Sequence, residues 1–290
     1  MTGTCTYSWS CGSRSVNLGT RTLLMGVLNV TPDSFSDGGD FLNIDQAVRH
    51  AVTMQAEGAD IIDIGGESSR PGAEPVSERQ ELDRVIPVIE ILKKELDCLL
   101  SIDTTKASVA KAAIRAGADV INDISACRFD PGMAPLAAET GAGVVIMHMQ
   151  GEPRTMQENP CYNDVIGDII RHLQNRMHEL IKHNVSPEQL AVDPGIGFGK
   201  RLSDNYEILR RLGEFRVLER PVLVGPSRKS FIGKLLDLPV QERLEGTIAA
   251  STAAVLNGAH IIRAHDIKAL KRAVSVADAI IGKYTLDPSL

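Results

Sequence analysis

Polar side chains follow the short apolar runs of this chain, at the points where each run gives way to a turn. They are carboxylates, carboxamides, a lysine, an arginine and two histidines: Asn29, Asp63, Glu67, Asp103, Asn122, Asp123, His148, Asp193, Lys229, Arg263 and His265. A single Asp or Asn at such a turn could simply cap the next helix. Lys, Arg and His do not serve as caps, so capping does not explain the whole set. The pattern favours a binding site assembled from several turns.

These residues represent two kinds of ligand chemistry. Asp103, Asn122 and Asp193 can together bind a flat ring that displays an amino group and N–H donors, because carboxylates accept hydrogen bonds and a carboxamide both accepts and donates. A second set consists of cations and suits an anion: Arg70, Lys229, Arg263 and His265. A ligand with a donor-rich ring and a phosphate would use both sets.

Short aliphatic runs alternate with longer stretches of helical period from Thr22 onward, which is typical of repeated βα units around a parallel sheet. Eight such runs are present: 23–30, 61–65, 99–103, 120–123, 143–147, 190–193, 221–225 and 261–263. A doubly wound sheet has the same alternation, but it usually carries a glycine fingerprint after its first strand. Here that turn reads Asn-Val-Thr-Pro-Asp at 29–33.

We therefore predict an α/β fold, a (β/α)8 TIM barrel that forms a single domain over residues 21–290. Residues 1–20 are expected to be a loose tail or a short strand at the bottom of the barrel. In such a barrel the carboxyl ends of the strands converge on one mouth, and the seventh and eighth loops often hold phosphate. The polar residues would then face one another.

Two segments rich in Gly, Pro and Ser would frame that mouth, TPDSFSDGG at 31–39 and GGESSRPGA at 65–73. Either could be a solvated connection between elements. Phe35 in the first segment and Arg70 in the second favour a sharper interpretation, in which the loops close over a bound ligand.

Composition excludes several partners. The formal net charge is −6 and no run of basic residues could track a phosphate backbone, so we expect no nucleic-acid partner. No apolar stretch has the length of a membrane span and the first twenty residues are polar, so we expect no membrane association and a cytoplasmic location. The five cysteines contain no CxxC pair and are expected to be reduced thiols.

Two motifs invite other interpretations. Gly-Ile-Gly-Phe-Gly-Lys at 195–200 resembles a phosphate-binding loop, but Pro194 stands where the first glycine is required and Arg201 replaces the Ser or Thr. His148 has no partner at the spacing of a metal ligand, which favours a packed histidine over a zinc site.

Long blocks of the chain resemble the dihydropteroate synthases. They are MGVLNVTPDSFSDGG at 25–39, DIGGESSRPGA at 63–73, VINDISA at 120–126, MHMQGEPRTMQ at 147–157, DPGIGFGK at 193–200, GPSRKSFIG at 225–233 and IIRAHD at 261–266. The resemblance runs from about residue 22 to the end of the chain. It implies a transferase that condenses 6-hydroxymethyl-7,8-dihydropterin diphosphate with p-aminobenzoate, giving 7,8-dihydropteroate and diphosphate in folate biosynthesis. It also implies a homodimer and a target of sulfonamides.

The resemblance implies roles for individual residues. Asn29 would hold Mg²⁺, the expected cofactor, together with diphosphate oxygens. The pterin pocket would be lined by Asp103, Asn122, Met147, Asp193, Gly225 and Lys229, with Arg263 stacked on the pterin. Arg263 and His265 would hold the diphosphate end. The p-aminobenzoate site would be formed by Ser69, Arg70, Pro71, Phe198 and Ser227, and the first mobile loop would supply Asp33, Phe35 and Asp37.

One position departs from the family pattern, since Ser69 stands where Thr is usual, and the hydroxyl is retained. Two alternatives share parts of the site. A pterin-binding methyltransferase barrel would transfer a methyl group to a corrinoid partner, but would not need the segments TPDSFSDGG or SRKS. A catalytically silent pterin-binding scaffold is disfavoured because all the cations and Asn29 are present.

Overall fold

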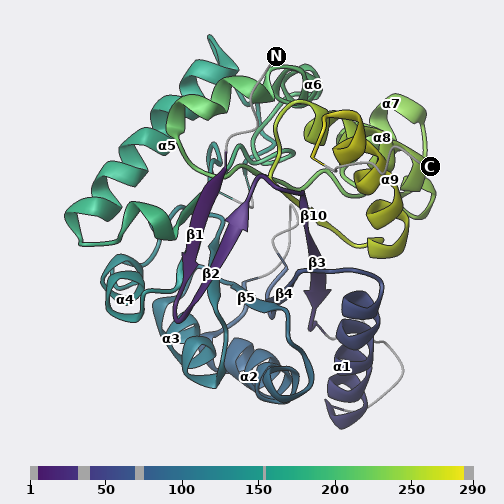
Figure 1. Cartoon of the computed structure of the whole chain (residues 1–290). Helices are drawn as coiled ribbons and strands as arrows, with labels where there is room; N and C mark the ends of the chain where they lie inside the picture. The colour runs from purple at the N-terminus through teal and green to yellow at the C-terminus, as the bar shows by residue number, and fades with distance from the viewer. Residues whose placement is uncertain (1–5, 32–39, 69–74, 153–154, 284–290) are drawn as a thin grey trace.

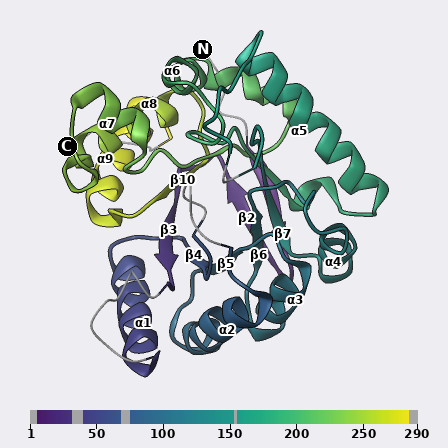
Figure 2. The same ribbon diagram turned by 180° about the vertical axis from the view of Figure 1, so that it is seen from behind.

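The structure is a computed structural model that describes residues 6–31, 40–68, 75–152 and 155–283. Within these residues an eight-stranded parallel sheet has the order β8-β7-β6-β5-β4-β3-β10-β9. A parallel bridge between Val192 and Val222 joins its two ends, so the sheet closes on itself. The helices surround it on all sides in both views (Figures 1 and 2). The prediction of a single-domain TIM barrel is confirmed.

Each barrel strand is followed by a helix. The strands are β3 (Leu23–Asn29), β4 (Ile61–Gly65), β5 (Leu99–Asp103), β6 (Val120–Asp123), β7 (Gly143–Met147), β8 (Leu190–Asp193), β9 (Leu223–Val224) and β10 (Ile261–Ala264). The helices are α1 (Asp40–Ala56), α2 (Glu78–Glu95), α3 (Ala107–Ala116), α4 (Met133–Thr140), α5 (Val165–Lys182), α6 (Leu202–Arg210), α7 (Ser230–Leu236), α8 (Leu244–Leu256) and α9 (Ile267–Ile280). Short 3-10 helices lie at η2 (Pro187–Gln189), η3 (Leu212–Leu218) and η4 (Val240–Glu242).

Alternate residues of each strand point into the barrel or outward to the helices. One buried cluster, which fills the lower interior, includes Ile61, Leu99, Val120, Ala191 and Ile261. Two residues further along the same strands stand polar groups: Asp63 after Ile61, Ser101 after Leu99, Asn122 after Val120, Asp193 after Ala191 and Arg263 after Ile261. The period of two therefore places an apolar plug below and a polar layer at the mouth.

A two-stranded hairpin closes the opposite end of the barrel. Its strands are β1 (Tyr7–Cys11) and β2 (Arg14–Leu18), paired antiparallel. Trp9 is fully buried against the lower interior and donates its indole N–H to the carbonyl of Gln189 at 2.8 Å. Figure 1 looks onto this hairpin, whereas in Figure 2 it lies behind the strands. Because this end is filled by packing, the carboxyl ends of the strands are the end left for ligands.

The strand at β9 is shorter than the predicted run 221–225. Pro221 and Pro226 have no amide N–H to donate to a neighbouring strand. The amide of Val222 donates instead to Nδ1 of His260 at 3.1 Å. The other strand boundaries agree with the predicted runs to within one residue. Among the described helices, none has both the length and the apolar character to cross a membrane.

Candidate active site at the carboxyl ends of the strands

Strand register brings the predicted site residues side by side at the mouth. Asn29 pairs with Gly65, which pairs with Asp103, and Asp103 pairs with Asn122. On the far side of the barrel Met147 pairs with Asp193. Residues that are dispersed along the chain thus form one layer because parallel strands begin and end together.

Arg263 connects the acidic side chains of this layer. Its Nε–H donates to Asp63 Oδ2 at 2.6 Å and its Nη2–H donates to Asp103 Oδ2 at 2.7 Å. Burial works to lower the pKa of Arg263, but the charges of Asp63 and Asp103 outweigh it and leave that pKa above its usual value. The guanidinium therefore stays charged. It also stands between the acids, so the anion-binding and donor-binding sets predicted from sequence are not spatially separate.

Two acids of this layer, Asp103 and Asp193, are destabilised as anions. Burial raises the pKa of Asp103 to about 7, against the opposing charge of Arg263. Burial also raises the pKa of Asp193, although Lys229 and the amide of Gly195 oppose this; that amide donates to Asp193 Oδ1 at 2.7 Å. Such buried acceptors gain from a ligand that donates hydrogen bonds to them.

Asp63 is a site residue that the sequence analysis noted at a strand end but assigned no ligand. Its Oδ2 accepts from Arg263 and from Asn122 Nδ2, the latter at 2.9 Å. Its Oδ1 is buried and has no hydrogen-bond partner within the described part of the chain. Its inward position two residues after Ile61 was the available signal, but the ion pair across the barrel depends on the closed fold.

Lys229 and Phe198 lie together beside this layer. The Lys229 ammonium is 4.3 Å from the centroid of the Phe198 ring, a cation–π contact, and it also donates to the carbonyl of Ile196. Burial lowers the pKa of Lys229 to about 8, and the charge of Asp193 limits the decrease. The ammonium is therefore easier to discharge than that of an exposed lysine.

Ser227 and His265 form the adjoining corner. The hydroxyl of Ser227 and Nδ1 of His265 are 3.0 Å apart, and the His265 amide donates to the same hydroxyl at 3.3 Å. Gly225 lies against Arg263, since a Cβ at that position would be in ordinary van der Waals contact with Arg263 Cβ at 3.6 Å. Met147 packs nearby with Met149, Met156 and Phe198. These residues form an apolar wall beside a polar corner.

The chemistry of Asn29 fits a magnesium ligand. The carboxamide is half-buried at the mouth, and its Oδ1 and Asp103 Oδ2 lie 3.8 and 3.9 Å from the point where a Cβ on Gly65 would stand. A carboxamide oxygen is a hard ligand, and Mg²⁺ needs few protein ligands when a phosphorylated substrate supplies the rest. The described residues contain no group of three His, Cys, Asp or Glu side chains that could hold a metal ion by themselves.

His148 is engaged in packing and hydrogen bonding. Its Nδ1 lies 3.0 Å from Lys200 Nζ, and its ring packs edge-on against His172 with centroids 4.9 Å apart. Burial, together with the charge of Lys200, lowers the pKa of His148 to about 2, so the ring is neutral. Nδ1 can therefore accept a hydrogen bond from Lys200.

Several predicted site residues lie outside the described part of the chain. They are Asp33, Phe35 and Asp37 in the first loop and Ser69, Arg70 and Pro71 in the second. Their roles remain predictions from the sequence. The described residues on the near side of each loop, Thr31 and Ser68, border the mouth because they follow the carboxyl ends of β3 and β4.

Comparison with known proteins identifies the family. The model of the family described as "Pterin binding enzyme" matches residues 25–265. A dihydropteroate synthase of Synechocystis sp. is 49% identical over 271 residues, which are 93% of this chain and 93% of that protein. A Yersinia pestis dihydropteroate synthase with a sulfonamide drug complex superposes with a TM-score of 0.89 at 46% identity, covering 94% of this chain and 99% of its own.

A Xanthomonas albilineans dihydropteroate synthase with 4-aminobenzoic acid superposes with a TM-score of 0.89 at 41% identity, over 96% of this chain and 99% of that one. Similarity in both sequence and structure thus extends over nearly the whole of both partners. The chain also has a closed barrel, and acidic side chains and an apolar wall line the mouth of that barrel. The chain belongs to the dihydropteroate synthase family.

Proposed function

We propose that this chain condenses 6-hydroxymethyl-7,8-dihydropterin diphosphate with p-aminobenzoate, and that its strand-end residues bind the two substrates as follows. The observation that carries the proposal is the cluster of Asp63, Asp103 and Asn122 around Arg263. A pterin displays an amino group and ring N–H donors, and a carboxylate whose pKa is raised by burial, as that of Asp103 is, gains most from such donors. The family membership supports the same assignment.

The pterin would occupy the polar layer. Asp103, Asn122 and Asp193 would accept or exchange hydrogen bonds with the ring, and Arg263, fixed by two acids, would offer its guanidinium face. Lys229 would donate to a ring acceptor from the other side. Met147 and Gly225 would form the walls. Oδ1 of Asp63 has no hydrogen-bond partner among the described residues, which makes Asp63 a further acceptor in the same pocket.

The diphosphate would extend toward the corner of Ser227 and His265. Arg263 lies between the two ends, so one guanidinium can contact the ring and still lower the energy of the leaving group. Arg70 from the second loop would add a charge there. Asn29 would hold Mg²⁺, which when bound would neutralise part of the charge of the diphosphate.

The reaction replaces the bond between the pterin methylene carbon and a diphosphate oxygen with a bond to the arylamine nitrogen, which releases one proton. The chain needs no nucleophile of its own. We propose a dissociative path in which Arg70, Arg263 and His265 stabilise the departing anion and the neighbouring carboxylates stabilise positive charge on the carbon. Closure of the loop that carries Phe35 would exclude water, which competes with the amine.

The p-aminobenzoate would enter between Phe198, Ser227 and the loop of Ser69, Arg70 and Pro71. Phe198 supplies an aromatic face, and Ser227 supplies a hydroxyl. The Xanthomonas relative binds 4-aminobenzoic acid and the Yersinia relative binds a sulfonamide drug. We accordingly propose that sulfonamides compete with p-aminobenzoate in this chain.

Product formation separates this function from its alternatives. A methyltransferase barrel would need a corrinoid partner, and a silent scaffold would bind pterin without turnover. Only a dihydropteroate synthase releases diphosphate from the pterin substrate in proportion to added p-aminobenzoate. That dependence on the amine is the test of the function.

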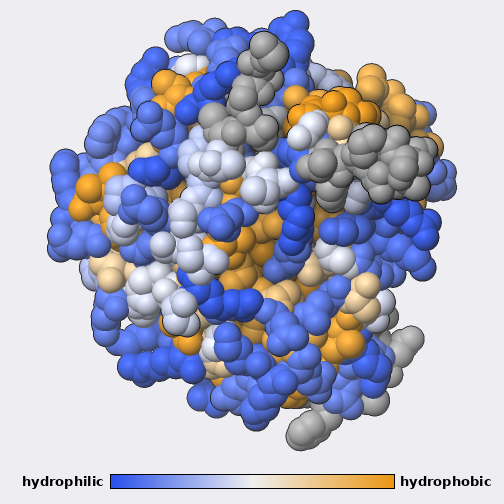
Figure 3. Space-filling view, viewed as in Figure 1, coloured by the Kyte–Doolittle hydropathy of each residue, from blue (hydrophilic) through white to orange (hydrophobic). Residues whose placement is uncertain are grey.

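A homodimer and a cytoplasmic location complete the proposal. Leu235 and Leu236 of α7 are 62% and 46% exposed, beside an apolar groove of about 540 Å³ between α6, α7 and α8. Apolar surface gathers over α7 and α8 at the upper right of Figure 3. The family resemblance implies a homodimer, and we propose this exposed apolar groove as the surface that the second copy covers.

A further inference from the structure

The loop between β8 and α6, residues 194–201, carries two groups that meet Lys229. The Phe198 ring lies 4.3 Å from its ammonium, and the Ile196 carbonyl accepts a hydrogen bond from it. Gly197 lies between them with φ of +82°, and a Cβ there would stand 2.9 Å from Lys229 Cδ. The backbone path of this loop therefore sets the positions of both the ammonium and the ring.

Phe198 is flanked by two glycines, Gly197 and Gly199, which have positive φ values of 82° and 60°. Glycine has more backbone freedom than any other residue. The ring packs with Met147, Met149 and Met156, and contacts that hold the two glycines further restrict the backbone that carries it. In this structure side chains from other parts of the chain hold both glycines; Gly197 has two such contacts, since its carbonyl also accepts a hydrogen bond from Gln157 Nε2 at 2.5 Å.

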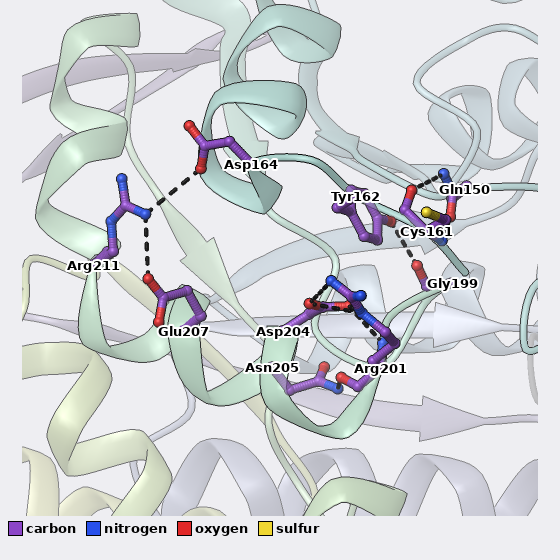
Figure 4. A network of polar contacts seen from close by, with 10 residues as sticks. All are labelled: Gln150, Cys161, Tyr162, Asp164, Gly199, Arg201, Asp204, Asn205, Glu207 and Arg211. Carbon is purple, nitrogen blue, oxygen red and sulfur yellow. Dashed lines mark hydrogen bonds and ion pairs between the residues drawn. The ribbon is translucent and has the colours of Figure 1, made fainter. Parts of the chain in front are cut away.

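Asn205 of α6 holds Gly197. Its Oδ1 accepts the Gly197 amide N–H at 2.7 Å and its Nδ2 donates to the Arg201 carbonyl at 2.7 Å, so one buried carboxamide spans the loop from its middle to its end. Figure 4 shows the second of these contacts. A backbone amide that lost its acceptor here would leave the loop with an unsatisfied, part-buried donor, which disfavours this backbone path.

Tyr162 holds Gly199. Its hydroxyl donates to the Gly199 carbonyl at 2.5 Å, from the connection between β7 and α5 (Figure 4). Within that connection Gln150 both donates to the Cys161 carbonyl at 2.9 Å and accepts the Cys161 amide at 3.0 Å. These bonds join two parts of the segment beside Tyr162.

The loop also contains a buried lysine, Lys200. Lys200 Nζ donates to the Phe198 carbonyl at 2.9 Å and to the His148 carbonyl at 3.3 Å. Burial lowers the pKa of Lys200 to about 7. Lys200 contacts Phe198 directly, so its replacement would disturb Phe198 itself. Asn205 and Tyr162 lie outside the loop and their hydrogen bonds to it reach only its backbone, and their replacement is therefore a more selective test.

We propose that Asn205 and Tyr162 are positioning residues for p-aminobenzoate: they hold the glycines on either side of Phe198 and so fix the aromatic face that receives this substrate. The inference rests on the proposed function. Neither side chain belongs to the acid layer around Arg263, which would bind the pterin. Loss of either contact should therefore affect the second substrate more than the first.

Three variants separate the contacts. Asn205→Ala removes both hydrogen bonds, whereas Asn205→Asp keeps an acceptor for the Gly197 amide. Tyr162→Phe removes only the hydroxyl. Tyr206→Phe on α6 is the matched control, since its hydroxyl donates to the Phe231 carbonyl at 3.1 Å, away from the loop.

The experiment measures KM for p-aminobenzoate at saturating pterin diphosphate and Mg²⁺, the Kd for the pterin substrate, and hydrogen exchange of peptides that cover residues 194–201. We expect Asn205→Ala to raise KM by about tenfold and to accelerate exchange in the loop. Tyr162→Phe should give a smaller rise, and Asn205→Asp should recover most of the affinity. The pterin Kd should rise less than this KM, because the acids around Arg263 stay in place and only Lys229 touches the loop at both Ile196 and Phe198, and Tyr206→Phe should match the wild type.

Unchanged KM and unchanged exchange in Asn205→Ala would overturn the inference. So would equal losses of affinity for both substrates, which would indicate general damage. If the wild-type chain made no amine-dependent product, the proposed function and the role in p-aminobenzoate binding would both fail. Faster exchange in Asn205→Ala would then establish only that Asn205 holds the loop.

Discussion

Arg263 and Asp63, which are 200 positions apart in the chain, meet at 2.6 Å between Nε and Oδ2 inside the barrel mouth. Asp63 is fully buried and also accepts from Asn122. This ion pair therefore aligns a cation and a carboxamide in the pocket proposed for the pterin. It makes Asp63 part of the site even though one of its oxygens is committed to the protein.

Asp63→Asn should weaken pterin binding by removing the charge that orients Arg263. A hydrogen bond to a charged group contributes about 2 kcal/mol, so the Kd for the pterin substrate should rise about thirtyfold. Titration calorimetry measures this. Asp60→Asn is the control, because Asp60 pairs with Arg21 at the opposite end of the barrel through contacts of 2.6 and 2.8 Å. A matching loss of affinity in the control would contradict the role of Asp63.

The pH profile of kcat/KM for the pterin substrate should be bell-shaped. Below about pH 7, Asp103 takes up a proton and loses acceptor capacity, since burial raises its pKa to about 7. Above about pH 8, Lys229 loses its charge, since burial lowers its pKa to about 8. The acid limb should disappear in Asp103→Asn and the alkaline limb in Lys229→Met. A wild-type profile that is flat from about pH 6 to about pH 9 would exclude both assignments.

The sequence predicts the barrel well because its pattern is local. Each strand from Leu23 to Arg263 is an apolar run bounded by a turn. Because every second residue of a strand points inward, the inward positions of Ile61 and Val120 predict that Asp63 and Asn122 also point inward. The shortened β9 shows the limit of that pattern. Its flanking prolines were visible, but the diversion of the Val222 amide to His260 depends on a side chain from a later part of the fold.

The membership of the site was also predictable, but its internal contacts were not. The strand-end rule identifies Asp103, Asn122 and Arg263, because parallel strands finish at one level. It does not reveal that Arg263 bonds to the acids rather than standing apart with the other cations. Asn205 lies on α6 and belongs to none of the sequence motifs. Its proposed role in positioning the loop follows only from its hydrogen bond to the Gly197 amide in the folded chain.

Asp193→Asn and Phe35→Ala should separate the two substrates. Asp193 lies in the polar layer, buried and bonded to the Gly195 amide, so its replacement should greatly reduce pterin affinity. Phe35 lies outside the described residues, and the sequence places it in the first loop. Its replacement should leave pterin affinity intact and slow the reaction with p-aminobenzoate. Equal losses of pterin affinity in the two variants would refute this division.

Leu236→Glu should convert a dimer to a monomer. The substitution places a charge in the apolar face of α7, so light scattering should report one 31.3 kDa chain where the wild type gives twice that mass. Val217→Glu is the control, because Val217 is 56% exposed on η3, outside the groove. A wild type that is monomeric at micromolar concentration would contradict the proposal, as would a Val217 variant that dissociates equally.

The most direct measurement is the yield of product from purified chain, pterin diphosphate and Mg²⁺, with and without p-aminobenzoate. We predict that diphosphate and 7,8-dihydropteroate form in equal amounts, that both depend on the amine, and that a sulfonamide competes with the amine. Diphosphate release at the same rate without the amine, or no release in its presence, would contradict the proposed condensation.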